Sequence, residues 1–400
     1  MSSIPGRGPT AIAAGPQLAG VNQGHVRSDL VDLAPGHPDP DLLPVGLIGR
    51  WTELALRTWG ARTLSYGADA GPLPLRAALA ERVEGPAGAA ACPPQSVVVT
   101  GGTSAAIGEL AALLGRQGRA VLTETPTYEL GRLIFAGRGL RTVRVPGPLD
   151  DLDVGELRRA AVRLARETGV PPAVYLIPTF HNPTGRVLSE PRRQEVAELA
   201  AELGLLVIED QAYAEIHAGT PPPPSIGHLA ADPDSVVSLH SMAKCLGPGV
   251  RIGWLVTGER LAAELAGDPV RVSGGGFNHL SALVVAAGCL SGELDEHVEG
   301  LREQLRRRRE ALLEPLLAGL PAGFSVAPPA GGYFAWVRLP AGTDEEELAR
   351  AAERHGMAFA PGHRFGSTTS GARLCFAARG PAEVSDGAAR FVAACGGLPG

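Results

Sequence analysis

Lysine is nearly absent from this sequence. The 400 residues include 36 lysines and arginines together, and Lys244 is the only lysine among them. So uniform a preference for arginine indicates a coding bias against lysine, and surface charge at position 244 would have been served equally well by arginine. Arginine stays protonated and is no nucleophile, whereas a partly buried lysine amine can lose its proton and attack a carbonyl to form a Schiff base. The single exception, Lys244, therefore indicates a chemical role. The alternative is that this lysine escaped the coding bias by chance.

Other absences narrow the class of protein. No segment approaches the roughly 20 apolar residues of a membrane span, and the Gly- and Pro-rich N-terminus lacks the apolar stretch of a signal peptide. Five cysteines, an odd number without paired spacing, argue against a disulfide framework and a zinc site. The net charge of -6, without a basic domain, gives no indication of a nucleic-acid or membrane partner. These features predict a cytoplasmic protein.

The rhythm of the chain predicts two domains after an N-terminal arm. Residues 1–28 are rich in Gly, Pro and Ala and are expected to form a loose arm. Over 29–276, apolar runs without polar alternation alternate with stretches of helical period, which predicts a large α/β domain with a mainly parallel sheet flanked by helices. Over 277–400, a long helical region precedes separate strands, which predicts a smaller α+β domain. The runs expected to form strands are 96–100, 120–124, 173–178, 205–210, 235–241, 253–258, 324–329, 333–340 and 372–378.

Polar residues follow several of these apolar runs, where the site of a parallel-sheet protein forms. Gly101-Gly102-Thr103-Ser104 lies between a strand and a helix, and its hydroxyls and backbone amides suit a phosphate as well as they suit a helix cap. Asn182, one of three asparagines, follows the run 173–178 in an Asn-Pro-Thr-Gly turn. Asp210 ends another run, where a carboxylate either pairs with a partner or caps a helix.

Two more polar residues bracket the lysine. Ser241 precedes Lys244 and Arg251 follows it, and a hydroxyl and a planar guanidinium both suit a phosphate oxyanion. A Schiff-base lysine, a carboxylate for a ring nitrogen and two clusters of phosphate donors are what pyridoxal 5'-phosphate (PLP) requires.

With these motifs in place, the chain resembles the fold-type I PLP enzymes of the class I/II aminotransferase family from about Leu33 to Phe391. It is most similar to the branch with kynurenine and 2-aminoadipate aminotransferases and the effector domains of MocR-type regulators. SMAKCLGPGVRIGW, residues 241–254, resembles the family's S-x-S-K-x-x-x-P-G-x-R-x-G-W. The resemblance implies a seven-stranded sheet. Ala243 and Cys245 depart from the usual Ser and Thr without removing a required group, and Cys245 is expected to be a buried, inert thiol.

The resemblance also implies roles for individual residues around the cofactor. Lys244 would form the Schiff base and serve as the base, and Asp210 would contact the pyridine nitrogen. Asn182 and Tyr213 would contact the phenolic oxygen, and Tyr128 would stack on the ring. The residues implied for the phosphate are Gly102, Thr103, Ser104, Ser241 and Arg251.

Substrate binding and subunit contacts are implied in the same way. Arg373 would grip the α-carboxylate as a bidentate pair, with Gly36 and Asn182 beside it; without the family context, Arg373 would read as an ordinary arginine on an edge strand. His37 and Arg364 are weaker candidates for the substrate side chain. Tyr66 would reach the phosphate of the neighbouring subunit, which implies a homodimer with shared sites.

The expected reaction is ping-pong transamination between an L-amino acid and a 2-oxo acid. The same site can run decarboxylation, elimination, cyclisation or oxygen-dependent oxidation, and the motifs do not show which bond at Cα breaks. A ligand sensor without turnover is a third hypothesis. It is disfavoured because the residues before Leu33 leave no room for a DNA-binding winged helix.

Overall fold

The computed structural model describes residues 27–83 and 92–397. The predicted N-terminal arm, residues 1–28, falls outside this part of the chain except for its last two residues. Among the described helices, none is both long and apolar enough to cross a membrane.

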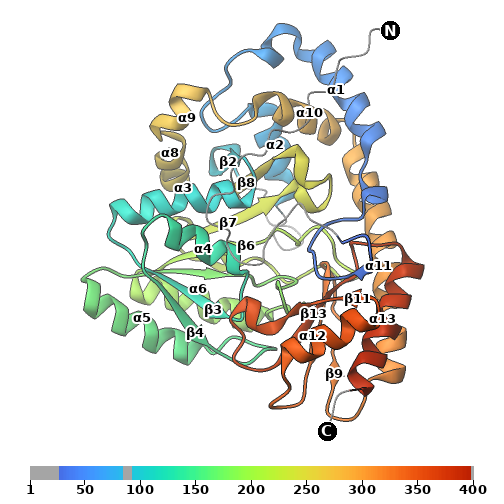
Figure 1. Cartoon of the computed structure of the whole chain (residues 1–400). Helices are drawn as coiled ribbons and strands as arrows, with labels where there is room; N and C mark the ends of the chain where they lie inside the picture. The colour runs from blue at the N-terminus through green and yellow to red at the C-terminus, as the bar shows by residue number, and fades with distance from the viewer. Residues whose placement is uncertain (1–26, 84–91, 398–400) are drawn as a thin grey trace, which may run out of the picture.

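A seven-stranded sheet forms the centre of the molecule (Figure 1). Every strand points the same way except β8, which runs antiparallel to both of its neighbours, so the mainly parallel sheet predicted from the apolar runs is confirmed. Across the sheet, the strands are β2 (Val97–Thr100), β8 (Gly253–Val256), β7 (Val236–Ser241), β6 (Leu206–Asp210), β5 (Ala173–Leu176), β3 (Val121–Thr125) and β4 (Thr142–Pro146).

Helices cover both faces of this sheet, which explains why its strands are apolar without alternation. On β5, Ala173 and Tyr175 pack into one core while Val174 and Leu176 pack into the other. The first core is closed by α3 (Thr103–Arg116), α4 (Glu129–Gly137) and α8 (Glu259–Ala266). The second is closed by α5 (Val154–Thr168), α6 (Glu190–Leu203) and α7 (Ile226–Leu229).

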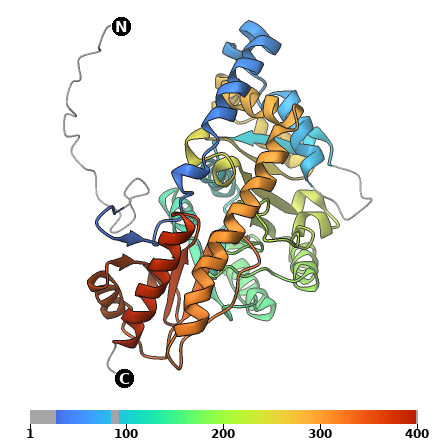
Figure 2. The ribbon, with the colours of Figure 1, turned by 90° about the vertical axis from the view of Figure 1, so that its right-hand side faces the viewer.

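The C-terminal part carries the strands expected there, in a second sheet. Its antiparallel order is β12 (Ala360–Pro361), β13 (Gly371–Cys375), β10 (Phe334–Arg338) and β9 (Ser325–Val326). The N-terminal strand β1 (Val31–Asp32) pairs with β11 (Met357–Ala358) beside this sheet. The remaining helices here are α11 (Glu293–Gly319), α12 (Glu345–Arg354) and α13 (Pro381–Gly396), and α11 packs along α13 (Figure 2).

Helices from both halves of the sequence meet near the N-terminal end of α11. There α10 (His279–Leu290) packs against α1 (Val45–Trp59) and α2 (Leu73–Arg82), next to the short α9 (Pro269–Gly274). The close approach depends on Gly288, because a Cβ there would lie 2.6 Å from the buried Trp51 ring. This end of the molecule leaves several apolar side chains exposed, among them Val45, Leu64, Leu73 and Val270.

Candidate active site

Lys244 lies in a single 3-10 turn, Met242–Lys244, directly after β7. Its Nζ donates to the Gly36 carbonyl oxygen at 3.0 Å. The same nitrogen lies 5.3 Å from the centre of the Tyr213 ring and 5.4 Å from that of Tyr333. Burial lowers the pKa of Lys244 to about 8, so a large fraction of this amine is neutral in mildly alkaline solution. The structure thus brings together Lys244, Tyr213 and Gly36, as the motifs predicted.

Two residues that the motifs did not indicate hold the lysine turn in place. The Tyr333 hydroxyl donates to the Lys244 carbonyl oxygen at 2.6 Å, and His297 Nε2 lies 2.8 Å from the Cys245 carbonyl oxygen. Cys245 itself is buried, and burial raises the pKa of its thiol, as expected for an inert cysteine. The turn is therefore anchored from the C-terminal half of the chain through its backbone.

Asp210 is a buried carboxylate at the end of β6, with one donor on each oxygen. Tyr175 donates its hydroxyl to Oδ2 at 2.8 Å, and the Ala212 N–H donates to Oδ1 at 3.1 Å. Burial raises the pKa of Asp210, and these hydrogen bonds and the Lys244 charge oppose that rise. No helix begins after Asp210 in the described chain until α7, so capping does not explain this carboxylate.

Arg373 and Asn182 form a second buried pair. Arg373 Nη1 donates to Asn182 Oδ1 at 2.8 Å, and its Nη2 donates to the Ala34 carbonyl oxygen at 2.5 Å. The guanidinium lies over the Phe334 and Phe365 rings, with its carbon 4.2 and 4.6 Å from the ring centres. β13 lies between β12 and β10, so Arg373 is not on an edge strand. Within the described residues, no carboxylate pairs with this buried guanidinium, which therefore suits an anionic group of a substrate.

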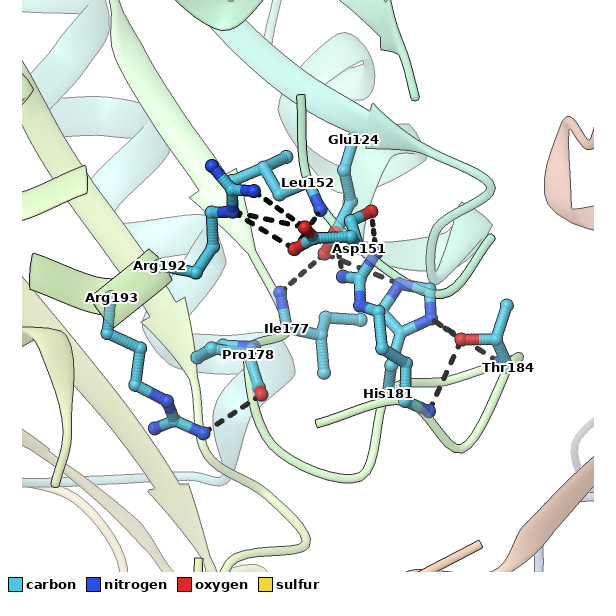
Figure 3. A network of polar contacts seen from close by, with 10 residues as sticks. Glu124, Asp151, Leu152, Ile177, Pro178, His181, Thr184, Arg192 and Arg193 are labelled. Atoms are coloured by element: carbon cyan, nitrogen blue, oxygen red, sulfur yellow. Dashed lines mark hydrogen bonds and ion pairs between the residues drawn. The ribbon is translucent and has the colours of Figure 1, made fainter. Parts of the chain in front are cut away.

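A buried polar network fixes the loop that carries Asn182 (Figure 3). Glu124, at the end of β3, accepts the Ile177 N–H at 2.6 Å and pairs with Arg186 and with His181 Nε2, the latter at 3.3 Å. Burial alone would raise the pKa of Glu124, but Arg186 and His181 hold it at about 2. His181 Nδ1 lies 2.8 Å from Thr184 Oγ1. The sequence did not predict this network, because the residue types alone do not show which of these side chains meet.

The residues predicted to bind the phosphate, Gly102, Thr103 and Ser104, lie at the start of α3. Gly102 is the N-cap, with φ +95°, and no side chain caps the helix. Thr103 and Ser104 are therefore the first helical residues, which excludes the capping role and leaves their N–H groups available to an anion. Arg251 Nη2 donates to the Gly101 carbonyl oxygen at 2.6 Å, and a Cβ on Gly102 would lie 2.8 Å from that nitrogen.

Ser241 and Tyr128 complete this end of the site. Ser241 is buried at the end of β7, and its Oγ accepts the Ala243 N–H at 3.1 Å. Tyr128 directly precedes α4. Burial raises the pKa of Tyr128, and the negative charge of Asp210 raises it further, against an opposing effect of the Ser104 side chain.

Tyr66 is the one predicted cofactor residue that stands apart. It is 84% exposed and makes no side-chain hydrogen bond within the described chain. Its segment packs against the glycine loop at 273–277, where a Cβ on Gly275 would lie 2.8 Å from the Gly67 nitrogen and one on Gly276 would lie 2.5 Å from the Ala68 oxygen. The glycines of that loop thus permit a close approach of two backbones.

His37 and Arg364, the weaker substrate candidates, lie near Arg373. The pKa of His37 is lowered by burial and then by the charges of Lys244 and Arg373. Arg364 is exposed in the turn Gly362–Phe365, and its charge acts on Arg373. Within the described residues, no group of three or more His, Cys, Asp or Glu side chains is placed to hold a metal ion.

Comparison with known proteins decides the family. The model of the family "Aminotransferase class I and II" matches residues 31–391. The chain belongs to the class I and II aminotransferases. Family, fold type and PLP dependence, as predicted from the motifs, are confirmed.

Relatives of this aminotransferase with assigned names support the same conclusion. It is 32% identical to aromatic-amino-acid aminotransferase 1 of Thermococcus litoralis, over 84% of this chain and 80% of that protein. It is 30% identical to 2-aminoadipate transaminase of Thermus thermophilus, over 93% of this chain and 91% of that protein. The crystal structure of Pyrococcus horikoshii kynurenine aminotransferase, in complex with PMP, superposes with a TM-score of 0.82 at 27% identity, covering 92% of this chain and 91% of that one.

The aminotransferase site fits PLP on its own geometry. A buried carboxylate, Asp210, suits a protonated ring nitrogen, and the uncapped start of α3 with Arg251 suits a phosphate. Lys244 has the lowered pKa that Schiff-base chemistry at an aldehyde requires.

Proposed function

We propose that the enzyme transfers the amino group of an L-amino acid to a 2-oxo acid by a ping-pong reaction, with Lys244 holding PLP and acting as the base. The observation that carries the proposal is the burial of the Lys244 amine beside the Gly36 carbonyl and the Tyr213 ring, where the charges of Arg373 and Asp210 act on it and its pKa is lowered to about 8. When bound, PLP supplies an electron sink for the carbanion formed at the substrate Cα.

The side chains around Lys244 would bind the cofactor at its two ends. Asp210 would pair with the ring nitrogen, because a buried carboxylate with one donor on each oxygen stays ionised beside a cation. At the other end, the uncapped N–H groups of α3 and the guanidinium of Arg251 would hold the phosphate. The remaining proposed contacts are Tyr128 on the ring face, Asn182 and Tyr213 on the phenolic oxygen, and Gly102, Thr103, Ser104 and Ser241 at the phosphate.

Lys244 would move the proton at the substrate Cα. Its neutral amine accepts a proton only if it is held close to Cα, and the Gly36 carbonyl and the Tyr213 and Tyr333 rings restrict where Nζ can lie. The pKa of about 8 lets the same amine accept the proton and return it near neutral pH. The exclusion of water by the surrounding rings strengthens these electrostatic effects.

Arg373 would bind the substrate α-carboxylate. Its guanidinium is buried, and its Nε has no protein partner within the described chain. The aromatic rings of Phe334 and Phe365 fix the plane of its donor fork. His37 and Arg364 would act on the substrate side chain, since their electrostatic effects link them to Arg373. Since the names of the relatives refer to aromatic amino acids, 2-aminoadipate and kynurenine, these are the first amino donors to test.

A cytoplasmic homodimer is the proposed working form, without a nucleic-acid partner. Val45, Leu64, Tyr66 and Leu73 are 78%, 75%, 84% and 60% exposed, and a group of exposed apolar side chains of this kind marks a protein interface. A second copy of the chain would cover them and would receive Tyr66 at its phosphate. All five cysteines are free thiols, which fits a reducing compartment.

The test is the absorption spectrum of the purified holoenzyme as amino acids are added without oxygen. A donor that bleaches the yellow cofactor band and releases its 2-oxo acid, with a second 2-oxo acid restoring the band, supports transamination. Release of ammonia or carbon dioxide, or a change that requires air, would assign the site to elimination, decarboxylation or oxidation. A cofactor band that no amino acid changes would favour a sensor.

A further inference from the structure

Asp210 receives a hydrogen bond that none of the motifs indicates. Tyr175 lies on β5, next to the strand that ends in Asp210, and its hydroxyl donates to Oδ2 at 2.8 Å. In the register of the two strands, Tyr175 is opposite Ile208, and Asp210 is two residues further along the same strand. Residues two apart share a face of the sheet, so the long tyrosine side chain reaches Asp210 diagonally.

The residues packed around Tyr175 restrict where its hydroxyl can point. The side chain is completely buried, and its ring packs edge-on against Phe135 with 5.8 Å between the ring centres. Gly131 lies beside the hydroxyl, where a Cβ would be 3.0 Å from the oxygen. Burial raises the pKa of Tyr175 well above its ordinary value, so the phenol keeps its proton and acts as a donor.

The groups around Asp210 divide into two kinds. Burial favours its protonated form, whereas the Tyr175 hydroxyl, the Ala212 N–H and the Lys244 charge favour its ionised form. Tyr128 and Tyr213 also face it, and the negative charge of Asp210 contributes to the raised pKa of both phenols. Three groups favour the ionised form of Asp210. The Ala212 N–H belongs to the turn that follows Asp210 itself, and Lys244 takes part in the reaction. Within the described part of the chain, Tyr175 is the one donor to Asp210 that lies on a separate element and takes no part in the reaction.

We propose that Tyr175 is a positioning residue for the reaction, whose hydroxyl keeps Asp210 ionised and aimed at the ring nitrogen of the cofactor. The inference rests on the role proposed above for Asp210 and adds a residue on which that role depends. Because the tyrosine touches neither substrate nor the reacting atoms, it acts through the carboxylate alone.

The test compares the affinity of wild-type and Tyr175→Phe apoenzyme for PLP from neutral to acidic pH, measured by equilibrium dialysis. Phenylalanine keeps the ring and its packing on Phe135 but removes the donor. We expect about a tenfold loss of affinity near neutral pH, the size of one hydrogen bond to a charged group. The loss should grow as pH falls, because without the donor Asp210 takes up a proton at a higher pH.

A second probe separates this role from a general loss of structure. In 1-deaza-PLP a carbon replaces the ring nitrogen, so nothing is left for Asp210 to pair with. Tyr175→Phe should bind this analogue as well as the wild type does. The matched control, Phe135→Leu, disturbs the same buried contact from the other side and should affect both cofactors equally.

Each outcome decides between the proposals. A loss for PLP alone, absent when Tyr175→Phe is made in an Asp210→Asn background, supports the inference. An equal loss for both cofactors, or no loss for either, overturns it while leaving the role of Asp210 intact. A wild-type enzyme that binds the two cofactors equally well at every pH would overturn the role of Asp210, and this inference with it.

Discussion

The two ends of the cofactor site differ in how deeply their residues are buried and in how many donors the described chain supplies to them. At the end proposed for the ring nitrogen, Asp210 is 5% exposed and each of its oxygens has a protein donor. At the end proposed for the phosphate, α3 starts without a capping side chain and Arg251 is exposed. The ring end is closed within the described chain, whereas the phosphate end is open to solvent, where the proposed second subunit would supply its Tyr66.

This difference follows from what each end has to do. A carboxylate that must stay charged in a buried place needs fixed donors, and strands β5 and β6 supply them from the core. A phosphate carries its own charge and is served by N–H groups and guanidinium groups that water already solvates. Substitutions at the ring end should therefore affect catalysis as well as cofactor affinity, whereas those at the phosphate end should affect cofactor affinity alone.

Asp210→Asn is expected to have the largest effect. The amide cannot stabilise a protonated ring nitrogen, so the electron sink weakens and kcat should fall by about a thousandfold or more. Initial rates with saturating PLP and the best amino donor would measure it. Asp153→Asn, at the N-cap of α5, is the matched control and should keep kcat unchanged. A kcat within tenfold of the wild type for Asp210→Asn would contradict the assignment.

Arg251→Gln should have an intermediate effect, confined to cofactor binding. Removing a guanidinium from the phosphate should weaken PLP affinity by about 10- to 100-fold, with kcat preserved once PLP is saturating. Because Arg251 is exposed, the affinity of the wild type should fall with added salt and that of the variant should fall less. Arg141→Gln removes an exposed arginine that pairs with Glu167 and serves as the control. A kcat defect at saturating PLP would show that Arg251 does more than hold phosphate.

Tyr66→Ala should have the smallest effect, at most about tenfold on PLP affinity, because a single uncharged donor to the phosphate is lost from an exposed position. The informative experiment mixes this variant with Lys244→Ala. A mixed dimer has one site with both Lys244 and Tyr66 and one site with neither, so mixing should restore activity at limiting PLP above that of either variant alone. Mixtures no more active than the sum of their parts would show that the site is not shared between subunits.

The sequence predicted the parts of the site that lie in loops after apolar strands. Lys244, Asp210, Asn182 and the start of α3 could be located because polar residues interrupt buried runs at those points. The sequence did not predict that β8 runs antiparallel, because its run Gly253–Val256 is as apolar as the runs of the parallel strands in the same sheet. The strand β4 was missed because it lies at the sheet edge, where only Val145 is fully buried.

The sequence did not predict the residues that hold the site residues in place without contacting the cofactor themselves. Tyr175 and Glu124 lie within strands, where a tyrosine or a glutamate in an apolar run gives no indication of which distant residue it meets. Tyr333 reaches Lys244 from a position 89 residues away, and Arg373 meets Asn182 across 191 residues. Such contacts depend on how two sheets pack together, which periodicity does not specify.

The central claim, that Lys244 holds the cofactor covalently, has a direct measurement because the chain has no other lysine. The holoenzyme would be reduced with borohydride, digested and analysed by peptide mass spectrometry, with Lys244→Arg as the control. We expect one pyridoxyl group per chain, located on the peptide that contains Lys244 and absent from the control. An enzyme that turns over amino acids yet carries no pyridoxyl group on Lys244 after reduction would contradict it.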